Sequence, residues 1–319
     1  MKRSKWRAYL PKTGAFYGII FFVILYSILL DGRYVTITNV INVFRQSATL
    51  CILAISSFLV ILTHQIDLSL GSITSLSGVV LGMLLARGAA LPVAIAGAIL
   101  TGMAVGALNG VLAGYTTVPP FVITLATMNI AKSVALVLNN GTLSVANAAL
   151  KWFNDTSLWI VPIPAILSIA LYLFFFWIMK YRRFGTKLYA VGGKEEAALT
   201  AGINVKRIKM LAYVIGGSLA GLAGVVYAAR LNAANPTQGS GLELDAICAT
   251  VLGGTALTGG QGSIWGSYLG AIAIFILRNG MNQMGVRIIE QLTVIGCVLI
   301  LILAFDVYNR RKEGKSLEL

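Results

Sequence analysis

Long stretches of apolar residues with few or no charged side chains constrain this chain more than any other feature. A helix that crosses the hydrocarbon core of a bilayer needs about 20 mostly apolar residues. Ten stretches meet or approach this length, of which the eighth is the weakest: 14–30, 47–63, 68–86, 92–113, 120–138, 160–179, 210–229, 246–258, 261–277 and 291–305. We therefore predict an all-α, polytopic integral membrane protein. It should form a single transmembrane domain over residues 1–319, with about ten helices, some of them short or broken.

The basic residues are grouped in three places. Of the 25 Lys and Arg side chains, five lie within residues 1–12, eight within 180–209 and four within 310–315. Since basic residues are retained on the cytoplasmic side of a membrane, we expect both termini and the loop at about 180–209 in the cytoplasm. An even number of spans agrees with this, and it places residues 139–159 outside. The net charge of +14 therefore reflects orientation in the lipid bilayer. A nucleic-acid-binding surface would need basic residues interleaved with aromatic ones on one face, and the sequence shows no such pattern.

The residue types that build catalytic, cofactor and metal sites are scarce. His64 is the only histidine and cannot form a histidine-based metal site by itself. The three cysteines, Cys51, Cys248 and Cys297, lie far apart in apolar stretches, which is typical of small buried side chains. The segment "EGKS" at 313–316 lacks the earlier glycine of a phosphate-binding loop. We expect no catalytic residue, no bound cofactor and no metal in this chain.

Polar side chains inside apolar stretches are costly in lipid and usually serve a function. Asp67 follows the second stretch in "HQIDLSLGS", and Asp245 precedes the short eighth stretch. Each carboxylate either caps a helix N-terminus or borders a pathway at a broken helix. The amides of Asn109, Asn129 and Asn279 either contact a polar solute or bond neighbouring helices. We predict that these five residues line or gate a translocation pathway.

Glycines at intervals of four residues occur twice, at Gly102, Gly106 and Gly110 and at Gly262, Gly266 and Gly270. This spacing places small residues on one helix face, where another helix packs closely. The two sets fit either an internal duplication or independent packing sites.

The longest distinctive segments resemble a known family. These are "YAVGGKEEAALTAGINVKRIKMLAY", "GSLAGLAGVVYAARLNAANPTQGSGLELDAICATVLGGTALTGGQGSIWGSYLGA" and, in the first half, "VILTHQIDLSLGSITSLSGVV". They closely resemble the permease subunits of bacterial ribose-type ABC importers, over nearly the whole chain. One departure is His64-Gln65, where the family usually has a small residue or glycine before "IDLS".

This resemblance implies a function and a set of partners. Such a permease moves a monosaccharide across the bacterial inner membrane. It receives the sugar from a periplasmic binding protein and works as a homodimer or heterodimer of two permease copies. A separate cytoplasmic ABC ATPase subunit hydrolyses the ATP, so the permease itself binds none.

The resemblance also implies a role for the central loop, because "EAALTAG" matches the E-A-A-x-x-x-G pattern by which importer permeases dock on their ATPases. The residues support a short helix there. Glutamates at the start and a glycine suited to a left-handed end favour a helix over 195–201, and its alanines are small enough to enter a partner's cleft. Leu199 and Ile203 supply apolar anchors. We predict an ATPase-coupling helix formed by Glu195, Glu196, Ala197, Ala198, Leu199, Ala201 and Gly202.

Other transport classes share some of these features. A branched-chain amino-acid importer permease has related glycine patterns. A secondary transporter driven by an ion gradient is a different class, in which we would expect more paired charges within the membrane. The sequence leaves the sugar open and does not choose between a homodimer and a heterodimer.

Overall fold

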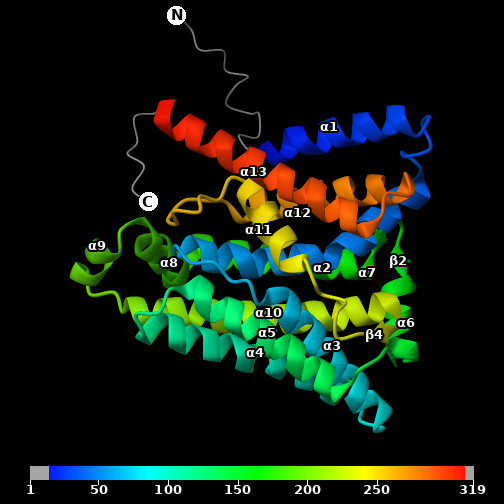
Figure 1. Ribbon diagram of the computed structural model, residues 1–319, viewed down its shortest axis with the longest axis horizontal. Helices are drawn as coiled ribbons and strands as arrows, with labels where there is room; N and C mark the ends of the chain where they lie inside the picture. The colour runs from blue at the N-terminus through cyan, green and yellow to red at the C-terminus, as the bar shows by residue number, and fades with distance from the viewer. Residues whose placement is uncertain (1–13, 313–319) are drawn as a thin grey trace, which may run out of the picture.

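The computed structural model describes residues 14–312, which form a bundle of long helices lying roughly side by side (Figure 1). The basic residues at 1–12 and Lys315 lie outside the described residues. In chain order the helices are α1 (Gly14–Leu29), α2 (Ile37–Leu62), α3 (Leu70–Ala86), α4 (Leu91–Tyr115), α5 (Pro120–Leu138), α6 (Ala148–Asp155), α7 (Ile163–Tyr181), α8 (Arg183–Gly193), α9 (Glu195–Thr200), α10 (Val205–Leu231), α11 (Leu242–Leu252), α12 (Ile264–Gln283) and α13 (Ile288–Lys312). The predicted all-α class is confirmed.

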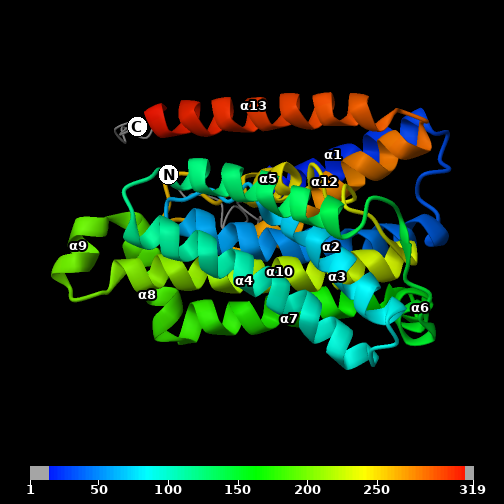
Figure 2. The ribbon, with the colours of Figure 1, turned by 60° about the horizontal axis from the view of Figure 1, so that its bottom comes forward.

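Two antiparallel pairs of very short strands are the only sheets among the described residues. Strand β1 (Leu143–Ser144) pairs with β4 (Ala233–Ala234), and β2 (Ser157–Leu158) pairs with β3 (Val161–Pro162). These strands and α6 lie at one end of the bundle, and α8 and α9 lie at the opposite end (Figures 1 and 2). We refer to them as the α6 end and the α9 end.

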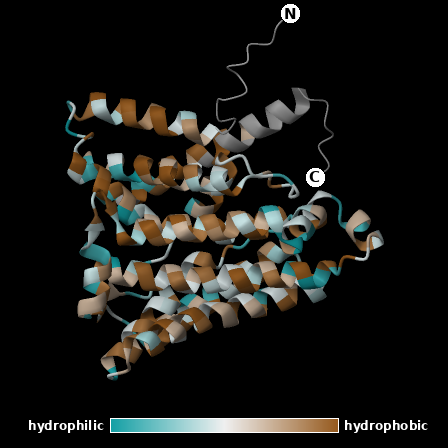
Figure 3. Ribbon diagram, turned by 180° about the vertical axis from the view of Figure 1, so that it is seen from behind, coloured by the Kyte–Doolittle hydropathy of each residue, from teal (hydrophilic) through white to brown (hydrophobic). Residues whose placement is uncertain are grey.

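Six helices are long and apolar enough to cross a membrane: α2, α4, α5, α7, α10 and α12. Helices α1 and α3 are also apolar but somewhat shorter. Hydrophobic residues predominate along the long helices, and hydrophilic residues are more frequent toward the helix ends (Figure 3). Many large apolar side chains are exposed on the outer faces, among them Phe21, Leu100, Val137 and Phe174. Exposed apolar surface of this extent marks a membrane-facing protein.

Helix α2 lies at the centre of the bundle, where Ile52, Leu53 and Phe58 are fully buried. It begins at Ile37, ten residues before the apolar stretch predicted from 47. Thr36 caps this start by accepting a hydrogen bond from the backbone N–H of Asn39 at 3.2 Å. The charge of Arg45 did not end the helix because its guanidinium reaches the α6 end and donates there to the backbone oxygen of Asp155.

Helices α4 and α10 approach each other more closely than side chains would allow. A Cβ atom added to Gly102 would lie 2.2 Å from the carbonyl oxygen of Gly217, and one added to Gly106 would lie 2.3 Å from that of Tyr213. Gly221 lies similarly close to Ala98. Real Cβ atoms do not come this near, so only glycine fits. The prediction that the first glycine set packs closely against another helix is confirmed.

The second glycine set behaves differently. Gly266 and Gly270 lie on α12 and pack against the backbone of Gly253 and Ala249 in and after α11. Gly262 precedes α12, whose N-cap is Ser263. The three glycines therefore do not share one helix face, contrary to the interpretation from spacing alone.

At two places the chain crosses the bundle by a short helix together with non-helical segments, where one continuous helix would be expected. The chain leaves α2 at the α9 end, and residues 63–69 run without helix before α3 begins. The eighth predicted stretch overlaps only α11, whose 11 residues span about 17 Å, roughly half of the hydrocarbon core. Irregular segments at 232–241 and 253–263 complete this passage (Figure 1). We call these two passages, 63–86 and 232–263, the interrupted crossings.

The α4–α10 contact yields a stability prediction. Gly106→Ala should destabilise the protein by about 1–3 kcal/mol, because the new methyl group would overlap the backbone of α10. Gly18→Ala is the matched control, since a Cβ there meets nothing within 4 Å and alanine favours the helix. Thermal unfolding in detergent measures both. Equal unfolding temperatures for the two variants would contradict the contact.

Candidate coupling surface and translocation pathway

The helix expected over 195–201 is present as α9, and its end has a specific geometry. Gly202 adopts a φ of +76°, and its N–H donates to the carbonyl oxygen of Leu199 at 2.9 Å. The N–H of Ile203 donates to the carbonyl oxygen of Ala198 at 3.0 Å. These two bonds form the Schellman arrangement that ends a helix at a left-handed glycine. Gly202 therefore terminates α9 as the sequence indicates.

The side chains of α9 divide into an inner and an outer set. Ala198 is only 3% exposed and belongs to the main hydrophobic core. The expectation that it enters a partner's cleft is wrong, because the short helix needs one buried residue to attach it to the bundle. Leu199 is 55% exposed, and Glu196, Ala197 and Ala201 are exposed as well. The outer surface thus offers one large apolar side chain among small and acidic ones.

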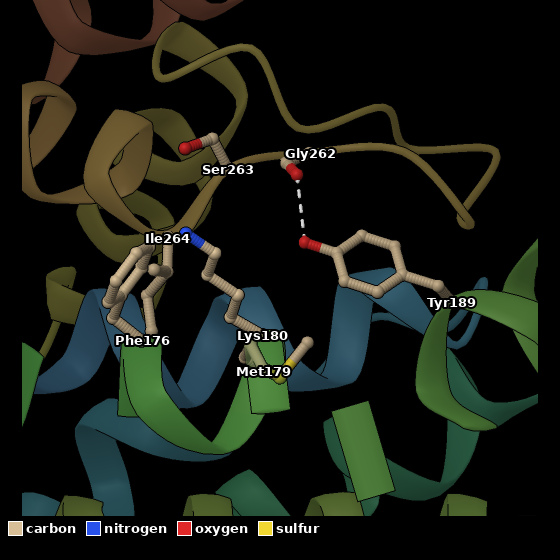
Figure 4. A pocket seen from close by; sticks show the side chains of 7 residues that line it. All are labelled: Phe176, Met179, Lys180, Tyr189, Gly262, Ser263 and Ile264. Carbon is tan, nitrogen blue, oxygen red and sulfur yellow. Dashed lines mark hydrogen bonds between the residues drawn. The ribbon is translucent and has the colours of Figure 1, made fainter. Parts of the chain in front are cut away.

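Helix α8 connects α9 to the bundle and was not predicted. Its Tyr189 hydroxyl donates a hydrogen bond to the carbonyl oxygen of Gly262 at 2.9 Å (Figure 4). Burial raises the pKa of Tyr189 above its usual value, so the hydroxyl keeps the proton that it donates. The bond crosses a cavity of about 250 Å³ lined by Phe176, Met179, Lys180, Tyr189, Gly262, Ser263 and Ile264. It attaches the helix before α9 to the end of the second interrupted crossing.

A buried polar network holds the first interrupted crossing. The Asp67 carboxylate accepts hydrogen bonds from the N–H and the hydroxyl of Ser69, at 2.8 and 2.6 Å. Asn109 on α4 donates to the Ser69 hydroxyl at 2.8 Å and accepts from the hydroxyl of Thr127 on α5. Asp67 therefore orders the start of α3, and Asn109 bonds neighbouring helices. Sequence reasoning found these two residues but missed Ser69 and Thr127, since hydroxyl residues are too common in spans to stand out.

A buried ion pair holds the second interrupted crossing. Arg278 on α12 contacts both carboxylate oxygens of Asp245 on α11, at 2.9 and 2.8 Å. Asp245 is only 1% exposed whereas the Arg278 side chain is 19% exposed, so the carboxylate is buried and the guanidinium only partly so. Arg278 was missed because it stands one residue beyond the predicted span at 261–277, where a basic residue reads as an end anchor. The role of Asp245 in a pathway stays a prediction.

The remaining two pathway candidates lie apart. Asn129 is exposed on α5 and its amide donates only to Leu125 of the same helix, at 3.0 Å. Asn279 follows Arg278 on α12, is buried, and accepts a hydrogen bond from Gln283 at 3.2 Å. The structure thus gives Asn109 a helix-bonding position and leaves Asn129 with a free surface. The contact of Asn129 with a solute stays a prediction.

The described residues hold no group of three or more His, Cys, Asp or Glu side chains that could bind a metal ion. Cys51 and Cys248 are buried, as expected for small apolar side chains, whereas Cys297 on α13 is exposed.

Comparison with known proteins identifies the family. Residues 39–303 match the model of the family described as branched-chain amino acid transport system, permease component. The chain is 37% identical to the ribose import permease protein of Escherichia coli strain K12, over 94% of this chain and 95% of the relative. It is 36% identical to the ribose import permease protein of Bacillus subtilis strain 168, over 96% and 95%. It is 35% identical to the D-allose transport system permease protein of Escherichia coli strain K12, over 92% and 91%.

The chain belongs to this family of transport-system permeases. No solved structure matches it. The resemblance derived from residues 189–213 and 217–271 and from the segment around Asp67 is thereby confirmed at the level of the family. Membership also fits the fold, since the permease has six long apolar helices and further short ones.

The two amides give a paired prediction. In the permease, Asn109→Leu removes two hydrogen bonds between helices and should lower stability by about 1–2 kcal/mol. Asn129→Leu breaks no bond to another helix, so it should leave stability unchanged and reduce transport. Thermal unfolding measures the first effect, and uptake of the labelled solute by the assembled transport system measures the second. Uptake at the wild-type rate by a normally folded Asn129→Leu variant would place this residue outside the pathway.

Proposed function

We propose that this chain is the membrane-spanning permease subunit of an ATP-driven importer. Its cargo is a monosaccharide, a ribose-like pentose or a related sugar, which it carries into the cytoplasm. The observation that carries this proposal is the identity of 35–37% to ribose and D-allose permeases over more than nine-tenths of both chains. The localisation that follows is the bacterial inner membrane, in which the chain passes several times.

The alternatives are less well supported. The family model is described by branched-chain amino acid transport, but the similar curated proteins are named for ribose, allose and xylose. A secondary transporter should carry several paired charges along its spans. Among residues 14–312, Arg278–Asp245 is the single ion pair that joins two helices in the middle of the bundle. A sugar importer permease explains both observations.

The proposal assigns partners to the two ends of the bundle. The α9 end faces the cytoplasm and α9 docks on an ABC ATPase, which binds and hydrolyses the ATP, so that this chain carries no cofactor and is not itself an enzyme. The α6 end faces the periplasm and receives the sugar from a binding protein. A second permease copy completes the pathway. Support comes from the exposed Leu199 and from the three basic clusters, which favour a cytoplasmic position for residues 180–209 and both termini.

The orientation leads to a labelling prediction. Single cysteines replacing Glu196 and Trp159 should react differently with a membrane-impermeant thiol reagent added from the periplasmic side. Trp159 is 98% exposed near the α6 end and should be labelled, while Glu196 on α9 should be protected. The background protein lacks Cys51, Cys248 and Cys297. Labelling at 196 and protection at 159 would reverse the orientation.

The docking role of α9 leads to a coupling prediction. Leu199→Asp replaces the exposed apolar anchor with a charge and should abolish ATPase binding or its stimulation, while insertion and folding stay normal. Gly202→Val should weaken docking too, because a β-branched residue at φ +76° costs on the order of 1–3 kcal/mol and distorts the helix end. Lys206→Gln is the control, since Lys206 lies beyond α9 over the ring of Tyr115.

Co-purification with the ATPase and ATP turnover in reconstituted complexes measure the effect. Ala198 is unsuitable for this test, because a large residue there would disturb the core of the permease itself. If Leu199→Asp and Gly202→Val both retain wild-type partner binding and stimulated turnover, α9 is an ordinary cytoplasmic helix.

A further inference from the structure

A polar recess of about 480 Å³ lies beside α9 and extends beyond the residues of the predicted coupling helix. It is lined by the end of α8 and the start of α9 (191–196), by His64 after α2, and by residues 258–261 before α12. The side chains of His64, Glu196 and Gln261 are exposed. Three segments that are distant in the sequence therefore meet in one concave surface at the α9 end.

The far wall of the recess is a rigid turn. Gly259 and Gly260 adopt left-handed φ values of +77° and +67°. The N–H of Ala256 donates to the carbonyl oxygen of Gln261 at 3.0 Å and closes the turn. The N–H of Gly260 donates to the carbonyl oxygen of Leu62, also at 3.0 Å, so the turn is bonded to the end of α2. We call residues 258–261 the recess turn.

Glycine contacts connect this wall to α8 without intervening side chains. A Cβ on Gly192 would lie 1.6 Å from the carbonyl oxygen of Leu62 and 2.6 Å from the nitrogen of Gly260. A Cβ on Gly260 would lie 2.5 Å from the backbone of Gly193. Backbones in direct contact have no flexible side chain to absorb a displacement. The helix before α9, the end of α2 and the recess turn are therefore expected to move together.

We propose that the recess is a second part of the ATPase docking surface, and that the ATPase contacts the recess turn as well as α9. The inference rests on the proposed docking of α9. The recess opens at the same end as α9 and shares Glu195 and Glu196 with it. Most of its exposed lining residues are polar, and Gly193 is exposed beside them, which suits hydrogen bonds from a soluble protein and not contact with lipid tails.

Contact with the recess turn gives the ATPase a direct connection to both interrupted crossings. The turn lies within the segment 253–263 that follows α11, and Leu62 and His64 lead into the segment that contains Asp67. A force on the turn reaches these two segments through backbone contacts. Docking through α9 alone would reach them less directly, through α8 or through α10.

Site-specific photocrosslinking in the purified complex of permease and ATPase tests the contact. A photoreactive phenylalanine analogue is introduced singly at Gln261 in the recess turn, at Leu199 on α9, and at Thr186. Thr186 is exposed on α8 but does not line the recess. We expect crosslinks to the ATPase from positions 261 and 199 and none from 186.

The pattern of crosslinks separates the two proposals. A crosslink from 199 without one from 261 overturns the recess as a docking surface and leaves the function of α9 standing. No crosslink from either position overturns the docking of α9 and the recess with it. An equal crosslink from 186 shows that contact is not confined to the recess and also overturns the inference.

A pair of substitutions adds a functional readout. Gln261→Trp places a large side chain in the recess and should weaken ATPase binding about tenfold, equivalent to about 1.4 kcal/mol. Thr186→Trp makes a comparable change outside the recess and should bind as the wild type does. Both residues are exposed, so neither change disturbs the core. Wild-type affinity and stimulated turnover for Gln261→Trp would overturn the proposal.

Discussion

The direct backbone contact between α4 and α10 is the constraint on which the rest of the bundle depends. Lipid offers no hydrophobic drive for helices to associate, so close packing must hold them together. Gly106 and Gly217 supply it by removing the side chains between the two axes. Helix α10 begins just after α9 and ends just before β4. One rigid helix, fixed along its length, therefore connects the proposed ATPase end with the proposed periplasmic end.

The interrupted crossings exist because that framework surrounds them. Irregular backbone at membrane depth is tolerated only where protein or a polar cavity satisfies its hydrogen-bonding groups. In one crossing the Asp67 carboxylate accepts the backbone N–H of Ser69 and Asn109 bonds the Ser69 hydroxyl, and the Arg278–Asp245 pair holds the other. Segments secured by a few polar contacts change conformation more readily than continuous helices. Their backbone connections to the recess turn make them the elements that the proposed ATPase contact would displace.

Much of the fold was predictable, and the errors have physical causes. Uncharged stretches near 20 residues identified the spans because lipid imposes that length. Their ends were misplaced where a long basic side chain reaches out of the apolar region, as Arg45 does from α2. The candidate site was predicted in part: α9 and Gly202 follow from local propensity, while the inward direction of Ala198 depends on what the helix packs against.

The sequence by itself determined the class of protein, the family, the number and approximate position of the apolar segments and the short helix at 195–201. These follow from interactions between near neighbours in the chain and from the thickness of a bilayer. Only the tertiary structure decided that Asn109 bonds other helices while Asn129 is exposed, and that Asp245 faces Arg278. Only the tertiary structure brought Leu62, Gly192 and Gly260 together, because contacts between residues more than 60 positions apart depend on how whole helices pack.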